Sequence, residues 1–209
     1  MKQKIPCFCD NDFFVEIPDA INLDKDASCI DKIMDGSFMN FICPSCGKKH
    51  KPEFPVTVLW PSKNIELEVL PEFDRGEFYR RKKQGNKKSS PKRETVIGYP
   101  EMADRIAVVR DGLEPIVVEA IKYYLQVKAE ETYPDAEIHI WYQTCNAESL
   151  EFHIHGIHQD EIAVSRIPIA LYKKTKADFS GNPKSEIFRA LRIGSYCSIS
   201  NMLRPEELK

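Results

Sequence analysis

The sequence predicts an α+β fold in which a zinc-ribbon-like N-terminal β module precedes a long helix packed on an antiparallel sheet. Three observations support this class: two cysteine pairs near the N-terminus, one long stripe of apolar residues at helical spacing, and a series of alternating runs separated by polar turns. The 209 residues are 42% hydrophobic and 30% charged, which is typical of a globular chain with enough apolar material for a core.

The first module is predicted to occupy residues 1–73. A short helix is expected within it, capped by Asp24 or Asp26 and ended by Gly36. Short, apolar and β-prone runs flank this helix, and each predicts a strand: residues 13–17, 38–42, 54–60 and 65–70. The module has only a small apolar core, so metal binding would stabilise it.

The next segment, residues 74–95, is predicted to be a basic loop or linker. Nine basic residues crowd it, eight of them between residues 80 and 93, and few apolar groups are available for burial. The run from Arg80 to Arg93 can bind phosphate backbones, and Phe78 and Tyr79 beside it can stack on bases. Nucleic acid is therefore one candidate partner, and a solvated loop is the alternative. The candidate contacts are Arg80, Arg81, Lys82 and Lys83.

Residues 96–209 are predicted to hold the long helix and the sheet, continuous with the first module. The helix is expected from about Asp111 to Thr132, with Asp111 and Glu114 resembling a capping box. Residues 106–109 form either a short strand or the lead into this helix. Alternating runs then predict an antiparallel meander, followed by a short helix: residues 137–145, 150–157, 162–171 and 185–192.

Four of the seven cysteines form two tight pairs, Cys7-x-Cys9 and Cys43-x-x-Cys46. Four thiolates suit a tetrahedral zinc ion, and the turn Cys-Pro-x-Cys-Gly can aim backbone amides at the sulfurs. The one-residue spacer of the first pair is tighter than usual, so Cys29 is an alternative ligand to Cys7. Redox-active dithiols or inert buried thiols are the other interpretations of the pairs.

A closed set of four thiolates leaves no position open for substrate, which is typical of a structural site. We therefore expect a non-catalytic interaction or regulatory protein with structural Zn²⁺ and a protein partner. No apolar run is long enough to cross a bilayer, and the N-terminus lacks the apolar core of a signal peptide. These features predict a cytoplasmic protein with no membrane partner. The net charge of −2 excludes polyanion binding by the protein as a whole.

The order of several short segments resembles the CpXC domain family of bacteria and archaea. Residues 31–36, DKIMDG, and residues 43–47, CPSCG, stand where that family has a short helix ending in "DG" and its second cysteine knuckle. Residues 101–115, EMADRIAVVRDGLEP, are similar to its downstream helix entry. The resemblance spans roughly residues 5–130 and implies a bacterial protein with two cysteine knuckles. Its first pair differs in spacing from Cys-x-x-Cys, and the family is generally described as uncharacterised.

A histidine cluster on the predicted meander offers a third function. His139, His153 and His155 are expected on polar faces of neighbouring strands, near Glu137 or Glu151. Such a set can bind a second metal ion or act as acid and base in an enzyme. The alternative is a half-exposed sheet whose polar face carries imidazoles, because alternation alone explains their placement.

Overall fold

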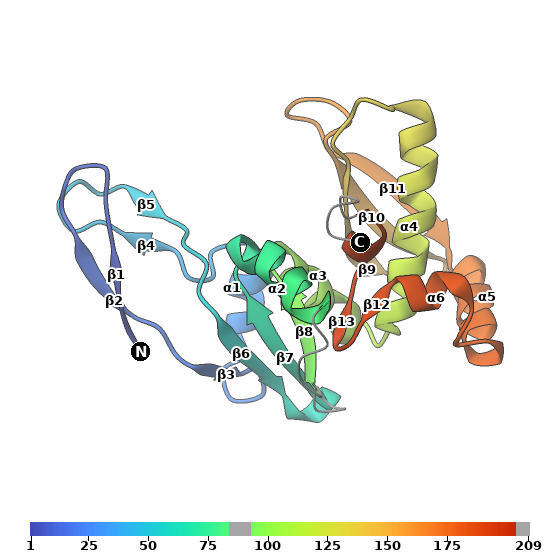
Figure 1. Cartoon of the computed structure of the whole chain (residues 1–209), viewed down its shortest axis with the longest axis horizontal. Helices are drawn as coiled ribbons and strands as arrows, with labels where there is room; N and C mark the ends of the chain where they lie inside the picture. Colours follow the sequence, from blue (N-terminus) through green and yellow to red (C-terminus); the bar gives the residue numbers. More distant parts are fainter. Residues whose placement is uncertain (84–92, 204–209) are drawn as a thin grey trace. The chain divides into compact units, whose positions relative to one another are not determined.

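The computed structural model describes residues 1–83 and 93–203, and it separates into two compact units, Met1–Ala103 and Asp104–Lys209 (Figure 1). The division falls inside helix α3 (Tyr99–Arg110). This helix contains residues 106–109, which are therefore helical and not a strand. Helices and several sheets together make up the fold, and the predicted α+β class is confirmed.

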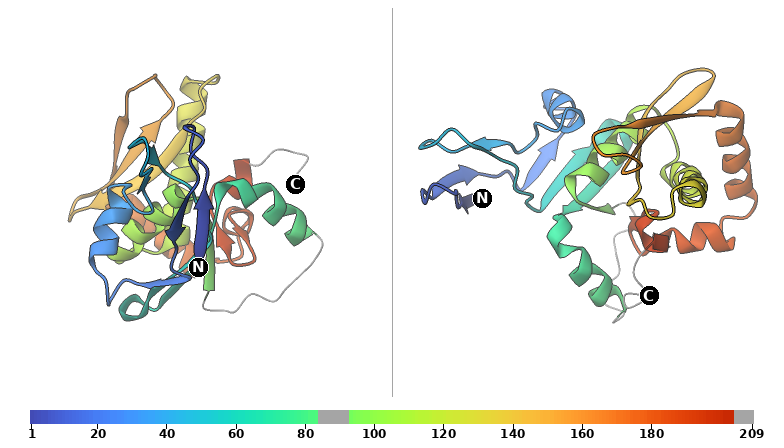
Figure 2. Two further views of the ribbon diagram at one scale, coloured as in Figure 1. Left: turned by 90° about the vertical axis from the view of Figure 1, so that its left-hand side faces the viewer. Right: turned by 90° about the horizontal axis from the view of Figure 1, so that it is seen from above.

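Two short hairpins form the N-terminal part of the first unit. Strands β1 (Lys2–Ile5) and β2 (Phe13–Glu16) pair antiparallel, as do β4 (Phe41–Ile42) and β5 (Lys49–His50). The hairpins lie side by side (Figures 1 and 2), and each turn carries one cysteine pair. Their shared core is small, with Ile5, Phe13, Cys7 and Cys43 buried and three partly buried residues against them. This arrangement is the predicted zinc-ribbon-like module.

A mixed sheet forms the rest of the first unit. Its strands follow the order β3–β6–β7–β8, with β6 antiparallel to β7 and the two outer pairings parallel. Val58, Leu67 and Val69 are fully buried, because alternate residues of β6 and β7 face the core. The elements are β3 (Ala20–Asn22), helix α1 (Ser28–Met34), β6 (Val56–Trp60), the 3-10 turn η1 (Pro61–Lys63), β7 (Ile65–Leu70) and β8 (Arg93–Ile97).

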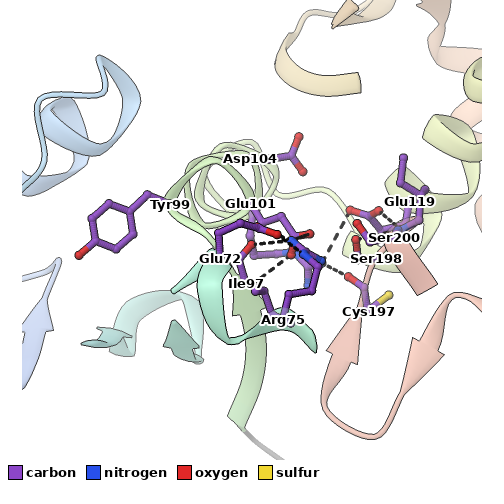
Figure 3. Close-up of polar contacts among 12 residues, drawn as sticks. Glu72, Arg75, Ile97, Tyr99, Glu101, Asp104, Glu119, Cys197, Ser198 and Ser200 are labelled. Atoms are coloured by element: carbon purple, nitrogen blue, oxygen red, sulfur yellow. Dashed lines mark hydrogen bonds and ion pairs between the residues drawn. The ribbon is translucent and has the colours of Figure 1, made fainter. Parts of the chain in front are cut away.

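The basic segment differs from the loop expected over residues 74–95. A 3-10 turn η2 (Glu72–Asp74) leads into helix α2 (Arg75–Lys83), and Arg93 begins β8; residues 84–92 lie outside the described residues. Phe78 and Tyr79 are buried and anchor the helix. Its first residue, Arg75, donates to Glu72, to Glu101 at 2.9 Å and to the Ile97 carbonyl at 3.1 Å (Figure 3). The burial of these two rings and the hydrogen bonds of Arg75 therefore stabilise a helix here, although the segment is rich in basic residues.

The second unit packs helix α4 (Pro115–Thr132) on an antiparallel sheet, as predicted. The sheet has the order β11–β10–β9, and α4 is seen nearly end-on beside it in Figure 2 (right). Ile140, Tyr142 and Phe152 are buried on the covered face, where Ile116 and Ile121 of the helix are also buried. The strands are β9 (His139–Cys145), β10 (Ser149–His155) and β11 (Ala163–Pro168).

The described residues of the second unit also form three further helices and a short hairpin. Residues 169–171 were expected in a strand, but Pro168 ends β11 and α5 begins at Ile169. The predicted helix near residues 185–192 is confirmed, with Ser185 at its N-cap position. No helix of the described residues is long and apolar enough to span a membrane. The elements are α5 (Ile169–Gly181), α6 (Glu186–Ala190), β12 (Arg192–Ile193), β13 (Tyr196–Cys197) and α7 (Ser200–Leu203).

A buried network of four charges joins α3 and α4 inside the second unit. Lys122 Nζ lies 2.8 Å from an oxygen of Asp104 and 2.7 Å from one of Glu119. Arg105 lies 3.8 Å from Glu119 and donates to the Cys197 carbonyl at 2.7 Å. Burial lowers the pKa of Lys122, but the two carboxylates raise it more, so its pKa lies above the usual range. The four charges therefore compensate one another.

Asp111 does not cap α4, which corrects the expected capping box. The helix begins at Pro115, and Glu114 occupies the N-cap position without a side-chain bond. Asp111 instead accepts from Arg110 at 2.8 Å and from the Tyr142 hydroxyl at 2.6 Å. Burial raises the pKa of Asp111, but these donors lower it more, so its pKa lies below the usual range.

We expect Asp111→Asn to destabilise the second unit by about 1–2 kcal/mol at pH 7, because a charged acceptor of two donors is lost. The lowered pKa of this carboxylate stabilises the folded state at pH values above about 3.9, the pKa of aspartate in the unfolded chain. This contribution is lost as the pH falls through the pKa of Asp111 in the folded state. Urea unfolding of both proteins at pH 7 and at about pH 2 measures the effect, and the difference should shrink at the lower pH. The exposed Asp135→Asn is the control; an equal change in both variants contradicts the prediction.

Candidate metal centre

The turns of the two hairpins bring four sulfur atoms together. The Sγ atoms of Cys7, Cys9, Cys43 and Cys46 all lie within 4.8 Å of one another. Across the hairpins, Cys7 lies 3.5 Å from Cys46, and Cys9 lies 3.7 Å from Cys43. A tetrahedral ion with metal–sulfur bonds of about 2.3 Å needs sulfur–sulfur distances of about 3.8 Å. The quartet can therefore hold a metal ion with little movement.

The second knuckle is a tight turn between β4 and β5. The Gly47 N–H donates to the Cys43 carbonyl at 2.9 Å, and Gly47 adopts a left-handed φ of 72° that suits glycine. Burial raises the pKa of Cys43, but the backbone N–H groups of Cys46 and Ser45 lower it more, to about 6. Amides facing the sulfur thus favour the thiolate, as the Cys-Pro-x-Cys-Gly sequence predicts.

The first knuckle forms a similar turn with one residue fewer between its cysteines. The Asp10 N–H donates to the Cys7 carbonyl at 3.0 Å, and Asp10 has a φ of 61°. Asp10 therefore occupies the left-handed position that Gly47 has in the second turn, and aspartate is among the residues that tolerate it. The one-residue spacer does not prevent Cys7 and Cys9 from facing the other pair.

The pKa of Cys7 shows that four thiolates are unfavourable at this spacing unless a cation offsets their charge. The Cys9 N–H lowers the pKa of Cys7, but burial and hydrogen bonds with the other cysteines raise it, to about 12. Four thiolates at this spacing repel one another, so the site favours a cation that offsets their charge.

His50 is a site residue that sequence reasoning missed. Its Nε2 lies 3.1 Å from Cys7 Sγ, and its ring contacts Phe13 edge-on with centroids 5.6 Å apart. Asn11 Nδ2 also approaches Cys43 Sγ, at 3.9 Å. His50 follows the second cysteine pair by four residues, and that short spacing was the available signal. A ring nitrogen placed here can donate to a metal-bound sulfur and orient it.

We expect His50→Phe to weaken metal binding by about 10–100-fold, because the ring packing is retained while the contact with Cys7 is lost. Competition with a chelator of known affinity measures the change. His158→Phe, in the second unit, should leave metal affinity unchanged. Equal affinity in wild type and His50→Phe would show that His50 only packs against Phe13.

Cys29 lies outside the quartet. It is in α1, where its thiol lies 3.2 Å from a carboxylate oxygen of Asp26. Burial raises the pKa of Cys29, and the Asp26 carboxylate raises it further. A thiol held protonated by a neighbouring carboxylate is a poor metal ligand. The geometry thus favours Cys7 over Cys29.

The other predicted site residues lie elsewhere. The meander brings His155 directly opposite His139, as expected, and His153 opposite Trp141. Arg80 is exposed, and Arg81 pairs with Glu77 one helical turn away. Phe78 and Tyr79 are both buried and pack edge-on against each other, so these rings do not present a face for stacking on bases.

Comparisons with known proteins identify the family of this chain. A protein of Treponema pallidum (strain Nichols), described only as an uncharacterized protein, is 27% identical to this chain over 215 residues. The alignment covers 95% of this chain and 97% of the relative. No solved structure matches significantly. A family model described as CpXC protein matches residues 5–122, which contain both cysteine knuckles and the first part of α4. The chain belongs to the CpXC family.

Proposed function

We propose that the protein is a zinc-binding, non-catalytic interaction module whose cysteine quartet is a structural site. The sulfur spacing carries this proposal, since four atoms within 4.8 Å suit a single tetrahedral ion. A multinuclear iron–sulfur cluster would hold its ligands farther apart. Four protein thiolates fill the coordination sphere of zinc, which supports a structural rather than a catalytic role. A reducing compartment such as the cytoplasm keeps such thiols available.

Metal content tests the zinc proposal. Native mass spectrometry with elemental analysis of the purified protein should give one zinc ion per chain bound to the quartet. A visible absorption spectrum with stoichiometric iron would overturn zinc while leaving the site intact. Far less than one metal ion per chain, with all four thiols reacting freely, would overturn the site itself.

An exposed aromatic residue at the first knuckle supports the interaction role. Phe8, between two of the cysteines, is 91% exposed, and Lys48 Nζ lies 5.8 Å from its ring centroid. Ile42, beside the second knuckle, is 62% exposed. Exposed apolar side chains next to a rigid metal site suit a protein interface, where aromatic residues are enriched. We propose this hairpin tip as the surface that contacts a protein partner.

Crosslinking in the native cell tests the partner proposal. Phe8→Ala should remove a crosslinked protein band that wild type forms, with zinc content unchanged. Phe73 is 96% exposed but lies in η2 rather than at a knuckle, so Phe73→Ala is the matched control. The proposal fails if the band survives Phe8→Ala or is lost equally in both variants.

A further inference from the structure

Three of the five histidines meet on one face of the β9–β10 pair. Antiparallel pairing sets His155 directly opposite His139, while His153 is two residues from His155 on the same side of β10. Ile140 and Ile154 point to the opposite, buried face. The imidazole face stays open, with the side chain of His139 54% exposed and that of His153 28% exposed.

A glycine fixes the close approach at this end of the pair. A Cβ on Gly156 would lie 1.8 Å from the Glu137 carbonyl oxygen, and Gly156 has a φ of 91°. Only glycine lets the chain leaving β10 pass so close to the chain entering β9. The backbone beside His139 and His155 is therefore tightly constrained, so two imidazoles on adjacent strands are held as direct neighbours.

Carboxylates flank two of the three rings. His139 Nε2 lies 3.7 Å from a Glu137 oxygen, and His153 Nε2 lies 3.4 Å from a Glu151 oxygen. Glu151 is itself held by Arg166 at 2.9 Å. A histidine that ligates a metal through one ring nitrogen commonly donates its other N–H to a carboxylate. Glu137 and Glu151 lie within reach of His139 and His153 and can accept such an N–H once the rings have turned toward one another.

The protonation state of the third ring also suits a ligand. Burial lowers the pKa of His155, and the neighbouring rings of His153 and His139 lower it further. His155 is therefore neutral at pH 7, and neutral imidazole is the form that binds metal ions.

We propose that His139, His153 and His155 form a second metal site, for a divalent transition-metal ion, on the exposed face of β9 and β10. Directly opposite and alternate strand positions lie about 5–7 Å apart, which three imidazole ligands can span. Among the described residues, only the cysteines have three or more ligand atoms already converged. The histidine site forms when the rings rotate, including that of His139, now stacked parallel to Trp141.

This site differs in chemistry from the cysteine quartet. Imidazole nitrogens bind Zn²⁺, Ni²⁺ and Cu²⁺, and three protein ligands leave further coordination positions for water or another ligand. The exposed face allows the ion to exchange with solvent. The protein thus combines a closed site in the first unit with an open site in the second.

Titration of the zinc-loaded, full-length protein with Ni²⁺ at pH 7.5, followed by calorimetry, tests the proposal. One further equivalent should bind, and His155→Ala should weaken that binding about tenfold or more. His139→Gln, at an exposed position, repeats the test without risk to the core. His158→Ala is the matched control, because His158 packs edge-on against Tyr133 beyond the end of β10.

Three results would each overturn the inference. The first is that no Ni²⁺ binds to the zinc-loaded protein. The second is that wild type, His155→Ala and His139→Gln bind Ni²⁺ with equal affinity. The third is that His158→Ala loses as much Ni²⁺ affinity as His155→Ala. Binding that disappears near pH 5 and returns at pH 7.5 supports imidazole ligands, because protonated rings cannot bind the ion. Binding unchanged between these pH values counts against them.

Discussion

Replacing Cys43 with serine is expected to abolish metal binding and to unfold both N-terminal hairpins. Cys43 is 1% exposed and belongs to both the sulfur quartet and the small shared core. Structural zinc ions contribute about 10–16 kcal/mol to the folding of small zinc domains, far more than this core can replace. The remaining buried side chains, chiefly Ile5 and Phe13, are too few to hold four short strands together.

Hydrogen exchange followed by mass spectrometry measures this effect segment by segment. In Cys43→Ser, the amides of β1, β2, β4 and β5 should lose protection, while those of β9 and β10 retain it. Cys29→Ser is the matched control, since Cys29 lies in α1 outside the quartet. If both serine variants keep metal and protection alike, the quartet does not support the hairpins.

Replacing Lys122 with methionine is expected to destabilise the second unit by about 3–5 kcal/mol. Methionine fills a similar volume but leaves Asp104 and Glu119 buried without their shared cation. Neither carboxylate can turn to solvent, because Asp104 accepts from the Tyr142 N–H at 2.6 Å and Glu119 from the Ile199 N–H at 2.8 Å. The destabilisation is therefore the cost of burying two carboxylates when Arg105 is the one cation of this four-charge network that remains.

Denaturant unfolding of the second unit measures the loss as a fall in its transition midpoint. Lys128→Met removes another lysine of α4, one that is exposed and pairs with Glu131 at 2.8 Å. That surface pair contributes about 0–1 kcal/mol, so the control should unfold close to wild type. Similar midpoints for the two variants would mean that the buried charges are not coupled.

Local patterns in the sequence predicted much of the fold. The β9–β11 meander and the apolar stripe of α4 follow from spacing alone, because each side chain's face depends on its own position in the element. The cysteine quartet was equally accessible, since thiolate pairs have few other uses in a reducing environment. The left-handed Asp10 was not, because only the backbone geometry shows that it serves in place of glycine.

Features that depend on distant partners could not be predicted. Asp104, Arg105, Glu119 and Lys122 read as ordinary surface charges, and only their packing between α3 and α4 buries them together. The basic composition of residues 74–95 led to the prediction of a loop, but the burial of Phe78 and Tyr79 stabilises helix α2 in part of it. His50 looked unremarkable until the first hairpin placed Cys7 against it. In each case the tertiary contact overrides the local signal.

The split of the quartet between two hairpins has a consequence for biosynthesis. Cys9 and Cys43 are 34 positions apart, and the chain between them contains β3 and α1. When the first hairpin leaves the ribosome, it carries only two of the four cysteines. The quartet is complete only after Cys46 has emerged. Under the proposed zinc binding, metal capture closes this long loop, and the N-terminal hairpin becomes ordered only after Cys46 has emerged.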